Sequence, residues 1–170
     1  MNHLIRTIVI ALSLLPAAAQ NDASTIRNFL RINDQFCTGG QPRAEELAKL
    51  KADGIRAIIN LRPPSEYDAA TEAATARELG LRYFNIPVRF DDPRDEQATE
   101  FLKLTDDAAN RPAFIHCAAA VRAGAFWMIR RVLRDHWSIE EAEKEAAKIG
   151  LRNSPHLNAF AHRYIDAHKQ

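Results

Sequence analysis

Short apolar runs alternate with amphipathic stretches along most of this chain. β-Branched and aromatic residues in these runs predict strands at residues 35–38, 55–61, 81–88 and 112–115. Apolar residues at helical spacing predict helices near 45–51, 67–79, 95–104, 125–133, 139–149 and 155–165. Pro87 weakens the end of the third strand. The alternation predicts a three-layer α/β/α domain with a mainly parallel sheet of about four or five strands.

The first 19 residues have a different pattern. A start that carries Arg6 is followed by an apolar stretch, residues 8–15, that is too short to span a bilayer as a helix. The stretch ends in an Ala-x-Ala site at residues 17–19, which predicts a signal peptide cleaved after Ala19. Residues 20–170 would then be a single exported domain, periplasmic or secreted, without a stable membrane span. The alternative is an uncleaved N-terminal helix or anchor.

Composition and charge argue against some classes of function. The chain is 46% hydrophobic and 26% charged, which is typical of a globular domain. Without residues 1–19 it holds 22 basic and 22 acidic residues, and a neutral chain has no general attraction to nucleic acid. No Cys-x-x-Cys or His-x-x-x-His spacing indicates a metal site. We therefore expect no nucleic-acid partner, no metal and no cofactor, and the sequence leaves the oligomeric state open.

Residues 116–124 have the character of an anion-binding loop. They join a predicted strand to a predicted helix, so backbone N–H groups and the positive end of a helix dipole would converge there. A thiolate at Cys117 would be stabilised by the same donors and would be nucleophilic at neutral pH. The planar fork of Arg122 could hold a tetrahedral oxyanion. The alternative is a buried structural cysteine before an ordinary helix.

Other candidate residues also follow predicted strands. Ligands of parallel sheets bind beyond the carboxyl ends of the strands, so Arg62, Asp91 or Asp92, and the Cys117 loop could converge on one pocket. A carboxylic acid on a mobile loop could protonate a leaving group. The alternatives are a solvated helix start for Asp91 and Asp92 and a surface role for Arg62.

The two cysteines leave two possibilities open. In an oxidising compartment Cys37 and Cys117 could form a disulfide, which would mask the nucleophile. Otherwise Cys117 is a free thiol and Cys37 is a small core residue. The separation of their Cα atoms decides between the two.

Several motifs together carry a family resemblance: Gly39-Gly40-Gln41-Pro42, residues 58–66, Ile86-Pro87-Val88, residues 111–117, residues 122–127 and Gly150-Leu151. They resemble the beta-lactamase-hydrolase-like phosphatase domain, which belongs with the dual-specificity and tyrosine phosphatases. The resemblance covers nearly the whole mature chain and implies a cysteine-phosphatase-like fold. It implies that Cys117 attacks phosphorus, that Arg122 grips the phosphoryl oxygens, and that Asp91 or Asp92 is the general acid. The substrate would be a phosphorylated small molecule or a phosphoprotein, with phosphate contacts from Ala118, Ala119, Ala120, Val121, Ala123, Arg62 and His116.

The loop departs from the usual pattern of that superfamily. Four residues separate Cys117 from Arg122 where tyrosine phosphatases have five, and four is also the spacing of rhodanese-type sulfurtransferases. The loop contains no glycine, and a non-glycine residue at positive φ costs on the order of 1–3 kcal/mol, so the loop is either strained or of another shape. Ala123 replaces the hydroxyl residue that often follows the arginine. Three hypotheses remain: a phosphatase that forms a phosphocysteine intermediate, a degenerate domain that binds an anion or phosphorylated ligand without turnover, and a rhodanese-type sulfurtransferase.

Overall fold

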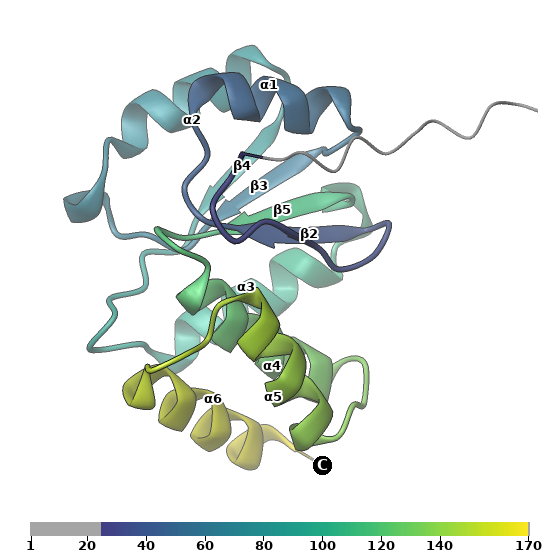
Figure 1. Ribbon diagram of the computed structural model, residues 1–170, viewed down its shortest axis with the longest axis vertical. Coiled ribbons are helices and arrows are strands. Elements are labelled where there is room, and N and C mark those ends of the chain that lie inside the picture. Colours follow the sequence, from purple (N-terminus) through teal and green to yellow (C-terminus); the bar gives the residue numbers. More distant parts are fainter. Residues whose placement is uncertain (1–24, 170) are drawn as a thin grey trace, which may run out of the picture.

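A sheet of five strands divides the molecule into two helical layers (Figure 1). This computed structural model describes residues 25–169, so the signal peptide predicted at residues 1–19 lies outside the described residues. The sheet order is β1-β2-β5-β3-β4; β1 runs antiparallel to β2, and the other neighbours are parallel. The strands are β1 (Leu30–Arg31), β2 (Phe36–Gly39), β3 (Ala57–Asn60), β4 (Arg82–Asn85) and β5 (Ala113–His116).

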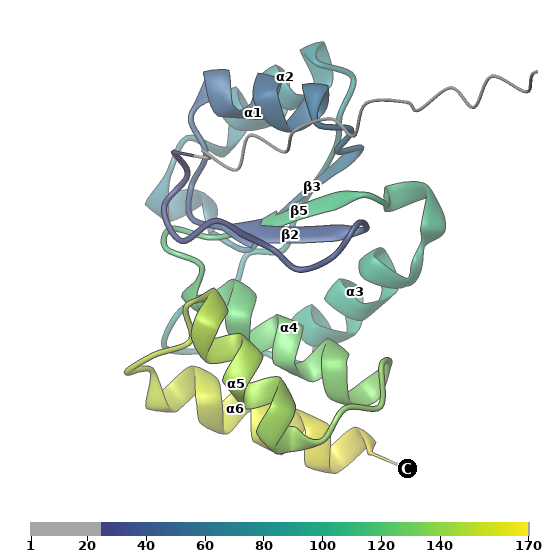
Figure 2. The same cartoon turned by 45° about the vertical axis from the view of Figure 1, so that its right-hand side comes forward.

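The helices cover both faces of the sheet, which confirms the predicted three-layer α/β/α architecture. One face carries α1 (Ala44–Ala52) and α2 (Ala69–Glu78), and the turned view shows both on the same side (Figure 2). The opposite face carries α3 (Asp95–Asp106), α4 (Val121–Leu133), α5 (Ile139–Ile149) and α6 (Pro155–His168). Two short 3-10 turns, η1 (Pro64–Glu66) and η2 (Ala108–Asn110), precede α2 and β5.

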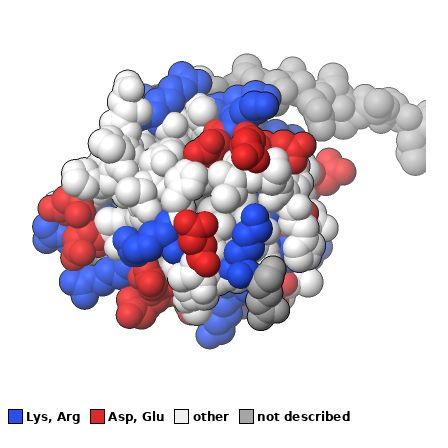
Figure 3. Space-filling view, turned by 90° about the horizontal axis from the view of Figure 1, so that it is seen from below, with Lys and Arg blue, Asp and Glu red and all other residues white. Residues whose placement is uncertain are grey.

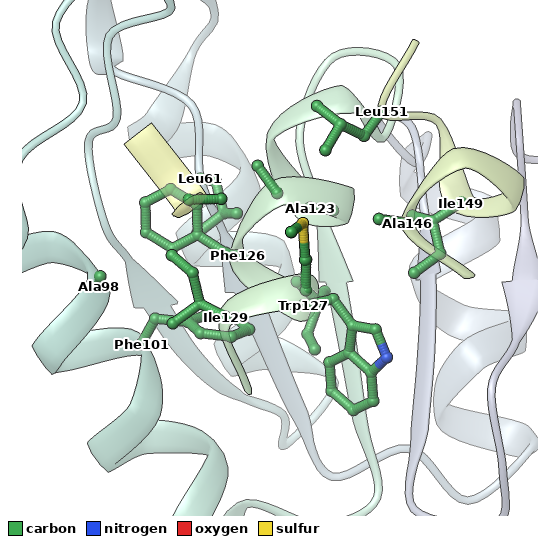
Figure 4. Packing of buried hydrophobic residues seen from close by; sticks show 14 of the residues in the cluster. Leu61, Ala98, Phe101, Ala123, Phe126, Trp127, Ile129, Ala146, Ile149 and Leu151 are labelled. Carbon is green, nitrogen blue, oxygen red and sulfur yellow. The ribbon is translucent and has the colours of Figure 1, made fainter. Parts of the chain in front are cut away.

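Successive side chains along a strand belong to two separate hydrophobic clusters, one on each face of the sheet. In β5 and the residue after it, Ala113, Ile115 and Cys117 belong to the cluster that α4 shares, whereas Phe114 belongs to the cluster under α1 and α2. The α4 cluster is the larger one, and Figure 4 shows Phe126 and other α4 side chains packed inside it. This alternation follows from the two-residue period of a strand buried on both faces.

The carboxyl ends of the four parallel strands lie in one row. Strand pairing places Gly39 of β2 beside His116 of β5, His116 beside Asn60 of β3, and Asn60 beside Asn85 of β4. The segments that leave these residues are therefore neighbours at one edge of the sheet. Among them are the Cys117 loop and the turns that carry Gln41 and Arg62. Strand order brings these segments to one edge, and the shared pocket stays a prediction.

Most of the predicted elements are present, with two differences. The two-residue strand β1 was not predicted, and α4 begins at Val121, four residues earlier than expected. The predicted capping box of α5 is present, because the Ser138 hydroxyl accepts from the N–H of Glu141 at 3.2 Å and the Glu141 carboxylate accepts from the N–H of Ser138 at 3.3 Å.

The face of the molecule seen from below has mixed charge. Basic and acidic side chains are interspersed on this face (Figure 3). Ion pairs join neighbouring helices, such as Arg163 of α6 with Asp95 of α3 at 2.9 Å. Among residues 25–169, no helix has both the length and the apolar character needed to cross a bilayer.

Candidate active site

Cys117 lies directly beyond the carboxyl end of β5. It is 1% exposed, and its side chain faces the cluster shared with α4. The backbone N–H of Cys117 donates to the carbonyl of Gly39 at 3.4 Å, which ties the start of the loop to β2. The sheet therefore fixes the position of the thiol, and only residues 118–120 separate it from α4.

The residue before α4 has a strained backbone. Ala120 is the N-cap of the helix and has φ of 66° and ψ of 0°, in the left-handed region that favours glycine. A non-glycine residue there costs on the order of 1–3 kcal/mol, so surrounding contacts must hold the loop in this shape. Of the two alternatives that the sequence left open for this loop, strain or another shape, the positive φ of Ala120 agrees with strain.

The carbonyl groups of the loop point outward. The carbonyl of Ala118 accepts from the N–H of Gln41 at 3.4 Å, and that of Ala119 accepts from the side-chain amide of Asn28 at 3.0 Å. In a trans peptide the N–H lies opposite the carbonyl, so the N–H groups of Ala119 and Ala120 point away from these partners.

None of the N–H groups of residues 118–123 makes a well-aligned backbone hydrogen bond in the described part of the chain. Together with the N-terminus of α4, they can receive an anion.

Arg122 is held over this loop by two protein partners. Its Nη1 donates to Glu66 Oε1 at 2.9 Å and to the carbonyl of Val88 at 2.8 Å, and its Nη2 donates to Glu66 Oε2 at 2.7 Å. Its Nε is buried and has no hydrogen-bond partner among the described residues. Burial would lower the pKa of Arg122, but the bonds to Glu66 and the nearby Cys117 raise it. A charged donor therefore remains available beside the thiol.

Glu66, at the end of η1, is a site residue that sequence reasoning missed. Its carboxylate receives both terminal nitrogens of Arg122, and its Oε2 also lies 3.4 Å from Arg62 Nε. The hydrogen bonds from Arg122 lower the pKa of Glu66 most strongly, and Arg62 adds to this effect against the opposing influence of burial. The carboxylate is therefore ionised at neutral pH and orients Arg122.

Arg62 is part of a chain of contacts rather than an isolated surface residue. Its Nη1 donates to Gln41 Oε1 at 2.7 Å, its Nη2 donates to the carbonyl of Glu66, and its guanidinium lies 4.7 Å from the ring centroid of Tyr67. Because Gln41 also donates its N–H to the carbonyl of Ala118, this chain connects the two ends of the loop. A direct phosphate contact from Arg62 stays a prediction.

His116 points away from the thiol. Its ring is buried and stacks on Phe114 with centroids 5.4 Å apart, on the side of the sheet that α1 and α2 cover. His116 Nε2 lies 3.2 Å from Glu72 Oε1, which is within ion-pair distance. Neither ring nitrogen makes a well-aligned hydrogen bond among the described residues. The predicted phosphate contact of His116 would have to involve its backbone, because the imidazole and Cys117 lie on opposite faces of the strand.

The Glu72 carboxylate of α2 accepts several hydrogen bonds near this edge of the sheet. Its carboxylate accepts from Gln41 Nε2 at 2.8 Å, from Asn60 Nδ2 at 2.5 Å and from the Tyr83 hydroxyl at 2.8 Å. Burial would raise the pKa of Glu72, but the contacts with His116, Tyr83 and Gln41 lower it below its ordinary value. A cavity of about 260 Å³ opens beside Glu72, between α1 and α2.

Asp91 and Asp92 lie on the loop that crosses Arg122. Asp91 pairs with Arg89 at 3.0 Å and Asp92 pairs with Arg94 at 3.1 Å, and all four side chains are largely exposed. Within residues 25–169, neither carboxylate forms a hydrogen bond or ion pair with Cys117 or Arg122. Phe90, between Arg89 and Asp91, lies over the guanidinium of Arg122, with 5.9 Å from Cζ to the ring centroid. The loop therefore reaches the site, with its carboxylates turned to neighbouring arginines.

The structure also separates the two cysteines. Both are free thiols, and Cys37 lies in the cluster under α1 and α2 while Cys117 lies in the cluster shared with α4. The disulfide that the sequence left open is therefore not formed. Burial raises the pKa of Cys37 to about 12, so this thiol is protonated at neutral pH. Among the described residues, no group of three or more His, Cys, Asp or Glu side chains could hold a metal ion.

Comparisons with known protein families agree on one group. The family model described as "DSP-PTPase phosphatase fused to NAD+ Kinase" matches residues 17–160. The chain is 30% identical over 118 residues to the beta-lactamase hydrolase-like protein of Xylella fastidiosa, a match that covers 66% of this chain and 27% of that protein. The chain therefore spans about a quarter of the length of the curated relatives it matches.

Solved structures show the same fold. The DUF442 protein of Shewanella putrefaciens CN-32 is 24% identical with a TM-score of 0.73, and the match covers 86% of this chain and 96% of that one. The core catalytic domain of the PP-IP phosphatase SIW14 from S. cerevisiae is 19% identical with a TM-score of 0.70, and the match covers 85% of this chain and 87% of that one. These likenesses establish a cysteine-phosphatase-like fold.

Proposed function

The chain belongs to the family of DSP-PTPase phosphatases described as fused to NAD+ kinase, and from this premise we propose that it hydrolyses phosphate monoesters through a phosphocysteine intermediate. One observation carries the proposal. Cys117 begins a loop whose N–H groups of residues 118–123 make no well-aligned backbone hydrogen bond in the described chain, and the unpartnered Nε of Arg122 lies beside it. Free donors around a nucleophile suit a phosphoryl group whose charge spreads over its equatorial oxygens.

The proposed reaction has two steps. In the first, the Cys117 thiolate attacks phosphorus, an S–P bond forms, and the P–O bond to the leaving group breaks as that oxygen takes a proton from an acid. In the second, water attacks phosphorus, the S–P bond breaks, and inorganic phosphate and the thiolate are released. The loop N–H groups and Arg122 would stabilise the oxygens in both steps. Glu66 would hold Arg122 in place.

The general acid in this proposal is Asp91 or Asp92. The Phe90 contact with Arg122 supports the assignment, because it places their loop over the site. The carboxylate that acts must leave its arginine, since the hydrogen bond from Arg89 lowers the pKa of Asp91 and keeps it ionised. Substitution of the acting residue by Asn would lower the rate with a leaving group of high pKa more than with one of low pKa.

A second candidate function is anion binding without turnover. Ala123 supplies no hydroxyl next to Arg122 to assist departure of the thiolate, and Asp91 and Asp92 are held by arginines. In that case the site would bind an anion or a phosphorylated ligand and release it unchanged. The four-residue spacing also keeps a rhodanese-type sulfurtransferase in consideration, and cyanide-dependent sulfur transfer from thiosulfate would identify it.

Hydrolysis of an aryl phosphate by the reduced protein tests the proposal. We expect turnover in the wild type and in Cys37→Ser, and loss of turnover to the background rate in Cys117→Ser, because only Cys117 reaches the loop. Retained binding of inorganic phosphate without turnover would select the second candidate. The same assay with phosphorylated small molecules and phosphopeptides would identify the substrate class.

Export is a separate proposal that rests on the sequence of residues 1–19. Expression in a Gram-negative host followed by fractionation and mass measurement tests it. A periplasmic product that begins at Gln20 is expected, and a cytoplasmic product that retains residues 1–19 would contradict it.

A further inference from the structure

The peptide between Ala119 and Ala120 is the strained part of the loop. Its carbonyl points outward to Asn28, and φ of Ala120 on its other side is 66°. Rotation of one peptide plane by half a turn changes ψ of the residue before it and φ of the residue after it by about 180°. Such a flip would return Ala120 to a negative φ, close to that of the third residue of a type I turn.

The flipped loop would be unsuited to an anion. The carbonyl of Ala119 would turn inward, and the N–H of Ala120 would turn outward toward Asn28. A partial negative charge would then face the position that the proposed phosphate occupies. Because Ala120 is not glycine, the flip also relieves strain, so the sequence of this loop favours the wrong orientation.

Asn28 opposes this flip from outside the loop. Its side-chain amide donates to the carbonyl of Ala119 at 3.0 Å, across 91 residues of sequence. The backbone of Asn28 itself has φ of 53°, a conformation that asparagine tolerates better than most residues. The neighbouring carbonyl of Arg27 accepts from the N–H of Gly40 at 2.7 Å, and Gly40 pairs with Ala119 in an isolated antiparallel bridge. The segment that carries Asn28 is therefore fixed against the loop.

Gly150 also packs closely against the same peptide. A Cβ atom at position 150 would lie 3.1 Å from the carbonyl oxygen of Ala119 and 3.2 Å from the carbonyl carbon of Ala120. This close packing limits the space around the peptide but supplies no donor to its carbonyl. Among the described residues, Asn28 provides the side-chain hydrogen bond that the outward orientation gains.

We propose that Asn28 is a positioning residue of the Cys117 loop, which holds the peptide between Ala119 and Ala120 with its N–H available to the bound anion. The inference rests on the proposed function, because it assumes that the loop binds an oxyanion. It assigns a role to a residue outside the Cys-to-Arg motif. It also explains how a loop without glycine can keep a left-handed residue before α4.

Calorimetric titration of the mature protein with inorganic phosphate tests the inference. The variants are Asn28→Gly, which removes the donor but keeps a residue suited to positive φ, Ala120→Gly, and the double variant. Asn153→Gly is the matched control, because Asn153 is also an asparagine at φ of 53°, is exposed, and makes no side-chain hydrogen bond within the described residues.

The expected result is a specific coupling. Asn28→Gly should weaken phosphate binding about three- to tenfold, the range of one lost hydrogen bond. In the Ala120→Gly background the same change should cost less than about twofold, because glycine removes the strain that drives the flip. Asn153→Gly should bind as the wild type does. If Asn28→Gly does not fold, Asn28→Ala replaces it with the same expectation, since alanine lacks the donor and adds no charge.

Three outcomes would overturn the inference. A wild type that binds no phosphate overturns the proposed anion site and this inference with it. A wild type that binds phosphate with an affinity that Asn28→Gly leaves unchanged overturns the role of Asn28 alone. If Asn28→Gly weakens phosphate binding equally in the wild-type and Ala120→Gly backgrounds, Asn28 acts on the fold and not on the peptide.

Discussion

Two nitrogens of Arg122 donate to protein acceptors, and the third, Nε, does not within the described residues. Two nitrogens bind Glu66, one of them also binds the carbonyl of Val88, and Nε has no partner among residues 25–169. A lysine could not satisfy these directions at once, because its donors radiate from a single nitrogen on a flexible stem. Glu66 therefore fixes the guanidinium plane, and the remaining edge is available to an oxyanion.

Glu66→Gln should remove an electrostatic contribution that depends on pH. The pKa of Glu66 is lowered in the folded protein, while a glutamate in the unfolded chain has a pKa of about 4.3. The ion pair therefore stabilises the fold above about pH 4.3, and this stabilisation is lost as the pH falls through the lower folded pKa. Because the Glu66 side chain is 34% exposed, solvent screening keeps the effect modest.

Thermal unfolding from pH 7 to pH 3 measures this contribution. The wild type should melt higher than Glu66→Gln at neutral pH, and the difference should shrink below about pH 4. Glu78→Gln is a suitable control, because Glu78 lies exposed at the end of α2. A difference between wild type and Glu66→Gln that stays constant down to pH 3 would contradict the ion-pair account.

At the residue scale, sequence patterns indicate candidates where chemistry and spacing coincide. Cys117 and Arg122 were proposed because both belong to one strand-loop-helix segment. Glu66 was missed because it is 56 residues from Arg122 and lies in a proline-rich turn with no distinctive pattern. Asn28 was missed for the same reason, at 91 residues from Ala119. Contacts of this kind depend on strand order, which hydrophobic periodicity does not specify.

Element boundaries follow the same logic. The buried strands were predicted because each is a short run of apolar residues, and α5 was bounded by its capping box. β1 has only two half-buried residues and depends on pairing with β2, so no local pattern marked it. α4 begins at Val121 because Ala120 turns the chain directly into the helix, an arrangement that tertiary contacts to the loop hold in place.

Gly124→Ala should destabilise the protein although alanine favours helices. The change gains up to about 1 kcal/mol in helix propensity. The new Cβ would lie 2.9 Å from the backbone oxygen of Ala146 and 3.0 Å from Cβ of Leu151, so α4 and α5 must separate. Overpacking of this kind costs about 1–3 kcal/mol, and backbone atoms cannot turn aside as a long side chain can. We expect a net loss of up to about 2 kcal/mol in the free energy of unfolding.

Urea denaturation of wild type and Gly124→Ala tests this balance. Ala74→Gly, at an exposed position of α2, measures the propensity difference by itself and should cost about 1 kcal/mol. The packing cost is then the loss in Gly124→Ala added to that propensity difference. A more stable Gly124→Ala would show that α4 and α5 can move apart without penalty.

The molecule as a whole keeps its two thiols apart by placing them on opposite sides of the sheet. Cys37 of β2 pairs with Phe114, and Cys117 lies three residues further along the neighbouring strand, roughly 10 Å at 3.3 Å per residue. A disulfide requires Cα atoms about 4.4–6.8 Å apart and Cβ atoms that face each other. Neither condition is met, because the two side chains enter different hydrophobic clusters.

Oxidation of the native protein should therefore leave Cys37 unmodified. Its thiol is fully buried, and burial raises its pKa to about 12, so almost no thiolate is present to attack a disulfide reagent. With oxidised glutathione, peptide mapping under non-reducing conditions should show no peptide linked through Cys37 and Cys117. Any loss of phosphate binding should proceed at the same rate in Cys37→Ala. In denaturant the sheet no longer separates the thiols, and the linked peptide should appear. Its formation in the native protein would require strand β2 or β5 to leave the sheet, and would contradict the two-sided core that positions Cys117.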